Sequence, residues 1–164
     1  MISKKMQDAF VDQINEELFS SYLYMSMAAW FESRNLRGMA QWMRVQAGEE
    51  HGHAMKFFDE IVERGGRVKL AEIKAPQFEW KTPIEAFQAA LSHEQHITKR
   101  INDLTDMAIK EKDHASEIFL QWFVKEQVEE EANADEIVHK FGFIGEAGHG
   151  LYMLDKELGA RKAD

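Results

Sequence analysis

Hydrophobic residues recur every three or four positions over most of this chain, the spacing that places side chains on one face of an α-helix. Four long segments follow this pattern, and a short one follows near the C-terminus. The alternation typical of strands is nearly absent, and the chain contains only two prolines. The pattern therefore predicts an all-α protein.

Local signals set the ends of the first two helices. Ser3 can act as the N-cap of a first helix that runs to about Phe31, and the sequence SRNLRG forms the turn that follows. A second helix is expected from about Met39 to Arg64, where two consecutive glycines end it.

The third helix has the clearest start. The sequence TPIE places Thr82 at the N-cap, a proline at the first helical position and Glu85 at the capping-box position. This helix ends near the sequence KEKDH, where a fourth begins and continues to about Phe143. A short helix at about 151–159 follows the glycine-bearing sequence GFIGEAGHG.

The lengths of the connections predict the topology. Short first and third turns imply antiparallel neighbours, whereas the roughly 17 residues before the third helix can span about 55 Å at about 3.3 Å per residue. We therefore expect a four-helix bundle at about 4–143 with one long crossover between helices two and three, plus the short C-terminal helix, as one domain over 1–164. A disordered insertion is the alternative for the crossover, but its alternating Val68, Leu70 and Ile73 favour an ordered segment.

Composition narrows the setting. The 164 residues are 45% hydrophobic, and without a long apolar run or a signal-like start they predict neither export nor membrane spanning, so the expected location is the cytoplasm. The absence of cysteine leaves only oxygen and imidazole ligands for a metal. The net charge of −9 argues against nucleic-acid binding and suits cationic ligands.

Each predicted inward stripe is interrupted near its midpoint by acidic or amide residues. The inward positions are Phe10, Ile14, Glu17, Ser21, Tyr24, Ala28 and Phe31 in the first helix and Met39, Met43, Gln46, Glu50, His53, Phe57 and Ile61 in the second. They are Phe87, Leu91, Glu94, Thr98, Ile101 and Thr105 in the third and Leu120, Phe123, Gln127, Glu130, Ala134, Ile137 and Phe141 in the fourth. In this bundle the polar positions arrive at one level and form a cluster.

Cations could offset the cost of burying such a cluster. One glutamate could extend to solvent as a boundary residue, but an uncompensated buried carboxylate costs several kcal/mol, and like charges about 4 Å apart repel each other further. Two divalent ions would neutralise four glutamates. Glu50 and His53, at i and i+3, can reach one metal together while Glu50 bridges to a second. The fourth helix offers Gln127 and Glu130 without a second histidine, so the predicted pair of metals, iron or manganese, is asymmetric.

The sequences ERGGRVKL, FLQWFVKEQVEEE and LYMLDKEL, together with the cluster residues, resemble the non-haem ferritins of bacteria and archaea over essentially the whole chain. The resemblance implies a ferroxidase that oxidises Fe(II) with dioxygen or hydrogen peroxide at a di-iron centre in each subunit. It also implies a homo-oligomeric hollow shell, usually of 24 subunits, that stores ferric mineral and serves iron homeostasis.

The resemblance also implies roles for individual residues. The ligands of the first iron would be Glu17, Glu50 and His53, and those of the second Glu50, Glu94 and Glu130, with Gln127 beside that pair. A third iron would be bound by Glu49, Glu126, Glu129 and Glu130, and Tyr24 and Trp122 match aromatic residues close to the centre. Haem is not expected, because His51 stands where haem-binding bacterioferritins have a methionine and helix four lacks their second histidine.

Two other classes of protein remain as alternatives. One is a di-metal oxidase or peroxidase of the rubrerythrin or ribonucleotide-reductase kind without storage, although the lack of cysteine excludes an attached rubredoxin module. The other is a metal-free helical interaction module, which would need apolar residues where this chain has acids.

Overall fold

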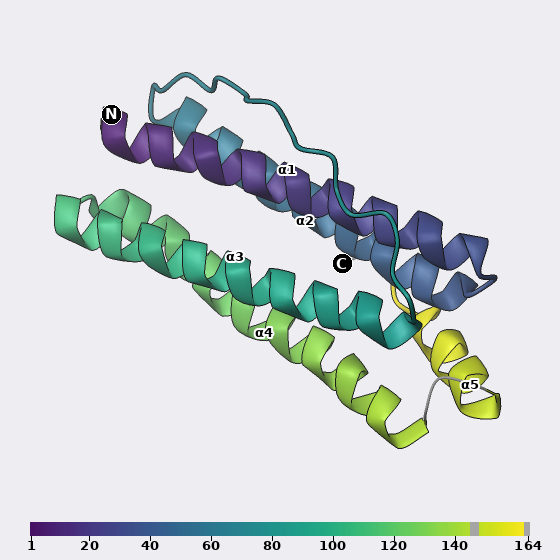
Figure 1. The fold of residues 1–164 in the computed structure, drawn as a ribbon. Coiled ribbons are helices and arrows are strands. Elements are labelled where there is room, and N and C mark those ends of the chain that lie inside the picture. Colours follow the sequence, from purple (N-terminus) through teal and green to yellow (C-terminus); the bar gives the residue numbers. More distant parts are fainter. Residues whose placement is uncertain (145–147, 163–164) are drawn as a thin grey trace.

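The computed structural model describes residues 1–144 and 148–162, and these confirm the predicted all-α bundle (Figure 1). Its elements are α1 (Lys4–Ser33), α2 (Arg37–Glu63), α3 (Pro83–Glu111), α4 (His114–Ile144) and α5 (His149–Leu158). Part of the predicted glycine-bearing connection before α5, residues 145–147, lies outside the described residues. No helix in the described ranges combines the length and apolar composition that a membrane span needs.

The predicted caps begin α1 and α3. The Ser3 side chain accepts a hydrogen bond from the backbone N–H of Met6 at 3.2 Å, and that of Thr82 accepts from the N–H of Glu85 at 3.3 Å. The carboxylate of Glu85 reaches the backbone N–H of Lys81 at 3.1 Å, one residue before the position that a capping box uses. These local contacts fix where α1 and α3 begin.

The long connection between α2 and α3 lies along α1, as Figure 1 shows, and crosses the length of the bundle. Its contacts follow α1 in order: Gln7 accepts from the N–H of Arg67 at 3.1 Å, Asn15 donates to the carbonyl of residue 72 at 3.3 Å, and Ser26 donates to that of residue 77 at 2.7 Å. The predicted ordered crossover is confirmed, and it delivers the chain to the opposite end of the bundle.

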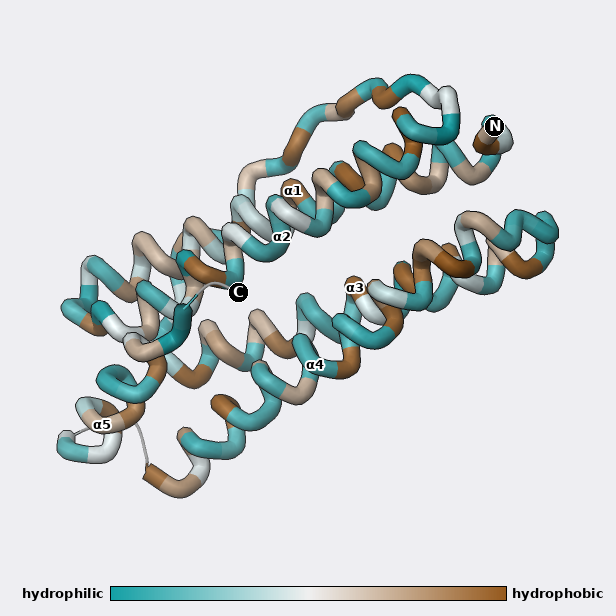
Figure 2. Tube along the Cα trace, turned by 180° about the vertical axis from the view of Figure 1, so that it is seen from behind, coloured by the Kyte–Doolittle hydropathy of each residue, from teal (hydrophilic) through white to brown (hydrophobic). Residues whose placement is uncertain are grey.

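Hydrophilic and hydrophobic positions alternate along each long helix (Figure 2), and the buried apolar residues form two clusters. One lies toward α5 and includes Phe31, Met43 and Phe87, while the other lies toward the opposite end and includes Phe10 and Phe57. Most of the buried polar residues fall between the two along the helices, but Gln13 and Ser116 do not. The core is therefore divided by a polar layer.

The predicted stripe of the third helix is partly wrong. Glu94, Phe87 and Ile101 are buried as expected, but the other buried positions of α3 are Ala86, Ala90, Ile97, Leu104 and Ala108, and Leu91, Thr98 and Thr105 are only half-buried. The buried stripe also steps by three and four residues, but in the opposite order after Phe87, so Ala90 rather than Leu91 faces the core. In α1 the expected Ser21 is likewise half-buried, and Ser20 is buried.

Helix α5 packs directly on the N-terminus of α2. A Cβ atom added to Gly38 would lie 1.6 Å from the backbone oxygen of Asp155, so only glycine permits this approach. The residue before α2, Leu36, makes no capping bond with its side chain, and Asp155 Oδ1 instead accepts from the backbone N–H of Met39 at 2.9 Å. The short helix thus caps the long one.

We expect Gly38→Ala to lower stability by about 1–3 kcal/mol, because the new methyl group must push α5 away from α2. Gly52→Ala is the matched control, since nothing lies within 4 Å of a Cβ there and alanine in a helix should add about 0.4–1 kcal/mol. Thermal midpoints of the two variants, measured with native mass, should move in opposite directions. A Gly38→Ala protein as stable as the parent would contradict the close approach.

Candidate metal centre

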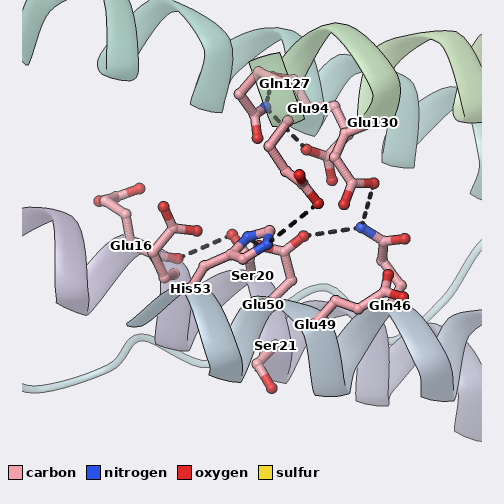
Figure 3. Close-up of polar contacts among 12 residues, drawn as sticks. Glu16, Ser20, Ser21, Gln46, Glu49, Glu50, His53, Glu94, Gln127 and Glu130 are labelled. Carbon is pink, nitrogen blue, oxygen red and sulfur yellow. Dashed lines mark hydrogen bonds and ion pairs between the residues drawn. The ribbon is translucent and has the colours of Figure 1, made fainter. Parts of the chain in front are cut away.

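The polar layer gathers six side chains from the four long helices at the middle of the bundle, and Figure 3 labels all of them except Glu17. None is more than 4% exposed. They are Glu17 of α1, Glu50 and His53 of α2, Glu94 of α3, and Gln127 and Glu130 of α4. Each lies in the interior of its helix on the buried face, so the helical repeat brings the six together.

The first part of the cluster joins α1 and α2. Ligand atoms of Glu17, Glu50 and His53 all lie within 4.8 Å of one another, and His53 Nδ1 is 3.5 Å from Glu50 Oε2. Glu17 Oε1 accepts a hydrogen bond from the side chain of Gln13 at 2.8 Å, while its buried Oε2 has no hydrogen-bond partner. This buried oxygen lies beside ligand atoms of Glu50 and His53, where it can bind either a proton or a cation.

The second part joins α3 and α4. The Tyr24 hydroxyl donates to Glu94 Oε1, and the amide of Gln127 donates to Glu94 Oε2 at 3.2 Å. Glu130 Oε2 accepts from the amide of Gln46 at 2.7 Å, and the same amide donates to Glu50 Oε1 at 3.0 Å. Gln46 therefore connects the carboxylate on α2 with the one on α4.

The residues expected to bind a third iron are not all together. His53 Nε2 lies 3.9 Å from Glu126 Oε1, and these two side chains with Glu130 form a second group whose ligand atoms lie within 4.8 Å. Glu129 is exposed and belongs to neither group within the described residues, and Glu49 pairs with an arginine from the C-terminal segment.

Burial sets the protonation of three carboxyl groups. Loss of solvent, followed by the charge of Glu50, raises the pKa of Glu17 to about 8 and that of Glu130 to about 7. The same two causes raise the pKa of Glu94 well above its ordinary value. At neutral pH the metal-free cluster therefore holds protons on carboxyl groups that would be ionised in water.

The pair of Glu50 and His53 behaves in the opposite way. Burial acts against the charged form of each, but the contact between them outweighs it, so the pKa of His53 rises to about 9 and the pKa of Glu50 falls. Burial and then the charge of Glu94 raise the pKa of Tyr24, which stays protonated as the donor to that carboxyl group.

A family model of the ferritin-like domain matches residues 7–144, which contain every residue of this cluster. The chain belongs to the ferritin-like family. It is 45% identical to a bacterial non-haem ferritin of Bacteroides fragilis over 161 residues, 98% of this chain and all of that protein. The corresponding protein of Staphylococcus aureus is 37% identical over 164 residues, covering 100% of this chain and 99% of that one.

Solved ferritin structures agree with the same fold. An open-pore ferritin from the hyperthermophilic archaeon Archaeoglobus fulgidus superposes with a TM-score of 0.97 and 53% identity, over 99% of this chain and 100% of that one. A site-directed variant of the Archaeoglobus fulgidus ferritin engineered toward a closed form gives a TM-score of 0.98 at 52% identity, covering both chains fully.

The residues of this ferritin-like chain fit divalent cations. The donors are carboxylate oxygens and one imidazole, which suit iron or manganese. One of these oxygens, Glu17 Oε2, accepts no hydrogen bond from the described residues. The imidazole of His53 belongs to both groups of ligand atoms, with Glu17 and Glu50 in one and with Glu126 and Glu130 in the other, whereas Glu94 belongs to neither within the described residues. The asymmetry between two metal positions stays a prediction.

Two residues that contact the cluster or its immediate neighbours were not identified from the sequence. Gln13 lies four residues before Glu17 on the same helix face, and that spacing could have revealed it. Arg161 comes from beyond α5, and no local pattern indicates that it reaches Glu49.

We expect the metal-free protein to lose stability as pH rises from about 5 to about 9. A carboxyl group whose pKa is raised from 4.5 to about 8, as for Glu17, keeps a proton in the folded state that the unfolded chain has lost. The imidazolium of His53 acts in the same direction, because its stabilising contact is complete below pH 6.5 and disappears as pH rises through about 9.

Thermal midpoints of the metal-free protein at about pH 5.5 and pH 8.5 test this expectation. Glu17→Gln should reduce the decrease, whereas Glu131→Gln, outside the cluster, should leave it unchanged. A midpoint that stays constant or climbs over this range contradicts the assigned protonation.

Proposed function

We propose that this protein oxidises Fe(II) at the centre formed by Glu17, Glu50, His53, Glu94 and Glu130 and stores the ferric product in a homo-oligomeric shell. The observation that supports it best is the buried carboxylate layer, which contains an unpartnered oxygen of Glu17. Membership of the ferritin-like family, with relatives that are bacterial non-haem ferritins, supports iron as the substrate.

Oxidation of Fe(II) by dioxygen would require two neighbouring metal positions. One Fe(II) can give up only one electron, whereas reduction of dioxygen to hydrogen peroxide takes two electrons and two protons, so two Fe(II) must react together. Glu50, between the two halves of the cluster, would bridge them. Glu17 and His53 would complete the first position, and Glu94 and Glu130 the second.

The cluster must release protons when Fe(II) binds. Glu17 and Glu94 hold protons at neutral pH, and His53 is an imidazolium, so each must lose its proton before it can act as a ligand. Tyr24 and Gln127 hold the two oxygens of Glu94 and so fix its orientation. Binding of Fe(II) should therefore strengthen as pH rises.

Assembly is supported by large apolar side chains exposed on the single subunit. Phe143 is 86% exposed, Ile118 74% and Phe78 73%, and aromatic residues such as the two phenylalanines are enriched in the cores of interfaces. The net charge of −9 suits the accumulation of cations inside a shell. The number of 24 subunits, the choice between dioxygen and hydrogen peroxide, and the cytoplasmic location stay predictions.

Glu50→Ala should abolish rapid oxidation while leaving the fold intact. The change removes a ligand from both metal positions. It breaks the pair with His53, but it also removes the negative charge that repels the other three carboxyl groups of the cluster, so the fold should persist. Stopped-flow oxidation of about two Fe(II) per subunit measures the rate, and native mass and thermal midpoint report the fold. Glu131→Ala is the matched control and should oxidise Fe(II) at the parent rate. Wild-type initial rates in an assembled Glu50→Ala protein would show that the cluster is not a di-iron centre.

Storage is tested separately from oxidation. The purified protein should be a large closed homo-oligomer by light scattering at low and high salt, and after aerobic loading it should retain far more iron than its metal sites can bind. Rapid oxidation by a monomer or dimer that retains no mineral would instead favour the oxidase or peroxidase alternative.

A further inference from the structure

The chain returns to the metal centre after its last helix. Arg161 lies three residues beyond α5, and its side chain is only 19% exposed. Its Nη1 donates to Gln46 Oε1 at 2.8 Å, its Nη2 donates to Glu49 Oε2 at 2.5 Å, and its Cζ lies 4.4 Å from the centre of the Trp42 ring. Three contacts of different kinds thus hold one guanidinium group beside the cluster.

The contact with Gln46 fixes the direction of that amide. A guanidinium group can only donate hydrogen bonds, so the oxygen of Gln46 must face Arg161 and its NH₂ group must face the carboxylates. That NH₂ group donates to Glu50 and Glu130 at 3.0 and 2.7 Å. Arg161 therefore acts on both carboxylates through Gln46 without touching either.

The contact with Glu49 places a positive charge beside the metal cluster. Glu49 precedes Glu50, and its charge is close enough to contribute to the raised pKa of Glu130. A metal bound by Glu49 and Glu130 would have to replace the charge-assisted hydrogen bond from Arg161.

We propose that Arg161 is a positioning residue that also competes with metal for Glu49, so that a third metal binds only when the guanidinium moves away. The proposal rests on the proposed function, because it assumes that the adjacent cluster binds two metals first. The competition makes the third position weaker than the other two.

The docking of α5 sets the position of this arginine. The close approach of Gly38 to Asp155 and the bond from Met39 to Asp155 fix the helix that precedes Arg161. A shift of α5 away from α2 would therefore carry the guanidinium away from Glu49, which connects the C-terminal helix to metal binding.

Binding of Zn(II), which undergoes no redox chemistry, tests the competition on the assembled protein. In calorimetric titrations, Arg161→Ala should bind the third equivalent about tenfold more tightly than the parent, because a charge-assisted hydrogen bond no longer opposes it. The first two equivalents should change less. Crystals soaked in Zn(II) should show higher occupancy beside Glu49 in the variant.

Arg44→Ala is the matched control. Arg44 is a residue of α2, the helix that Arg161 contacts. It carries the same charge and pairs with the carboxylate of Glu32 at 2.8 Å, but it lies on the surface. It should leave the affinity for the third equivalent unchanged. Arg161→Lys keeps the charge and loses the fork-shaped donor, so its affinity should lie between those of the parent and Arg161→Ala. This second variant also serves if Arg161→Ala fails to assemble.

The outcomes separate the two proposals. If the parent binds no Zn(II) at its first two equivalents, the proposed di-metal centre is wrong. If the first two bind normally but Arg161→Ala and Arg161→Lys bind the third no more tightly than the parent, the competition is wrong. An equal gain in Arg44→Ala would also contradict it, by showing a general charge effect. Adding Glu49→Gln to Arg161→Ala should remove the gain.

Discussion

The burial of four glutamates at one level of a helical bundle is the constraint on which the rest of this structure depends. Ionised carboxylates in a weakly polar interior cost several kcal/mol each, and their mutual repulsion adds to the cost. The chain accepts this layer because apolar side chains fill the bundle on both sides of it, around Phe31 and Phe87 at one end and around Phe10 and Phe57 at the other. The two apolar clusters stabilise the fold, so the polar layer between them need not contribute to stability.

Candidate ligands from four different helices stay together only if the helices are held in fixed register. Arg64 at the end of α2 pairs with Asp113 before α4 at 2.8 Å, while at the opposite end Asp155 of α5 caps the first turn of α2. The crossover adds bonds along α1. These contacts lie outside the cluster, and they prevent α1 and α2 from sliding against α3 and α4, which would separate Glu50 from Glu94 and Glu130.

The sequence predicted features that depend on local chemistry or on helical repeat. Ser3 and Thr82 could be recognised as caps, and Glu17, Glu50, Glu94 and Glu130 as one level, because each signal lies within a few residues or one helix face. The buried face of α3 was predicted only in part. Whether Ala90 or Leu91 faces the core depends on how the helices pack together, which no local pattern shows.

The contacts made by the C-terminal segment could not be predicted at all. Asp155 caps a helix more than a hundred positions earlier in the chain, and Arg161 reaches Glu49 across a similar separation. Neither residue differs from an ordinary surface charge in sequence. Only the close approach of α5 at Gly38, which depends on two helices meeting, brings them to their partners.

The metal-free cluster is balanced by its own positive charges and protons. The raised pKa of His53 supplies an imidazolium beside the ionised Glu50, Glu17 and Glu94 keep protons because burial raises the pKa of each, and Arg161 pairs with Glu49. The layer is therefore tolerable without metal, although its carboxyl groups face one another. Under the proposed function, divalent cations would exchange with these protons and with the guanidinium group rather than fill a vacant negative charge. Because the exchanged partner differs from carboxylate to carboxylate, neighbouring positions would then hold metal with different strength, and the difference would be set by groups that touch no metal.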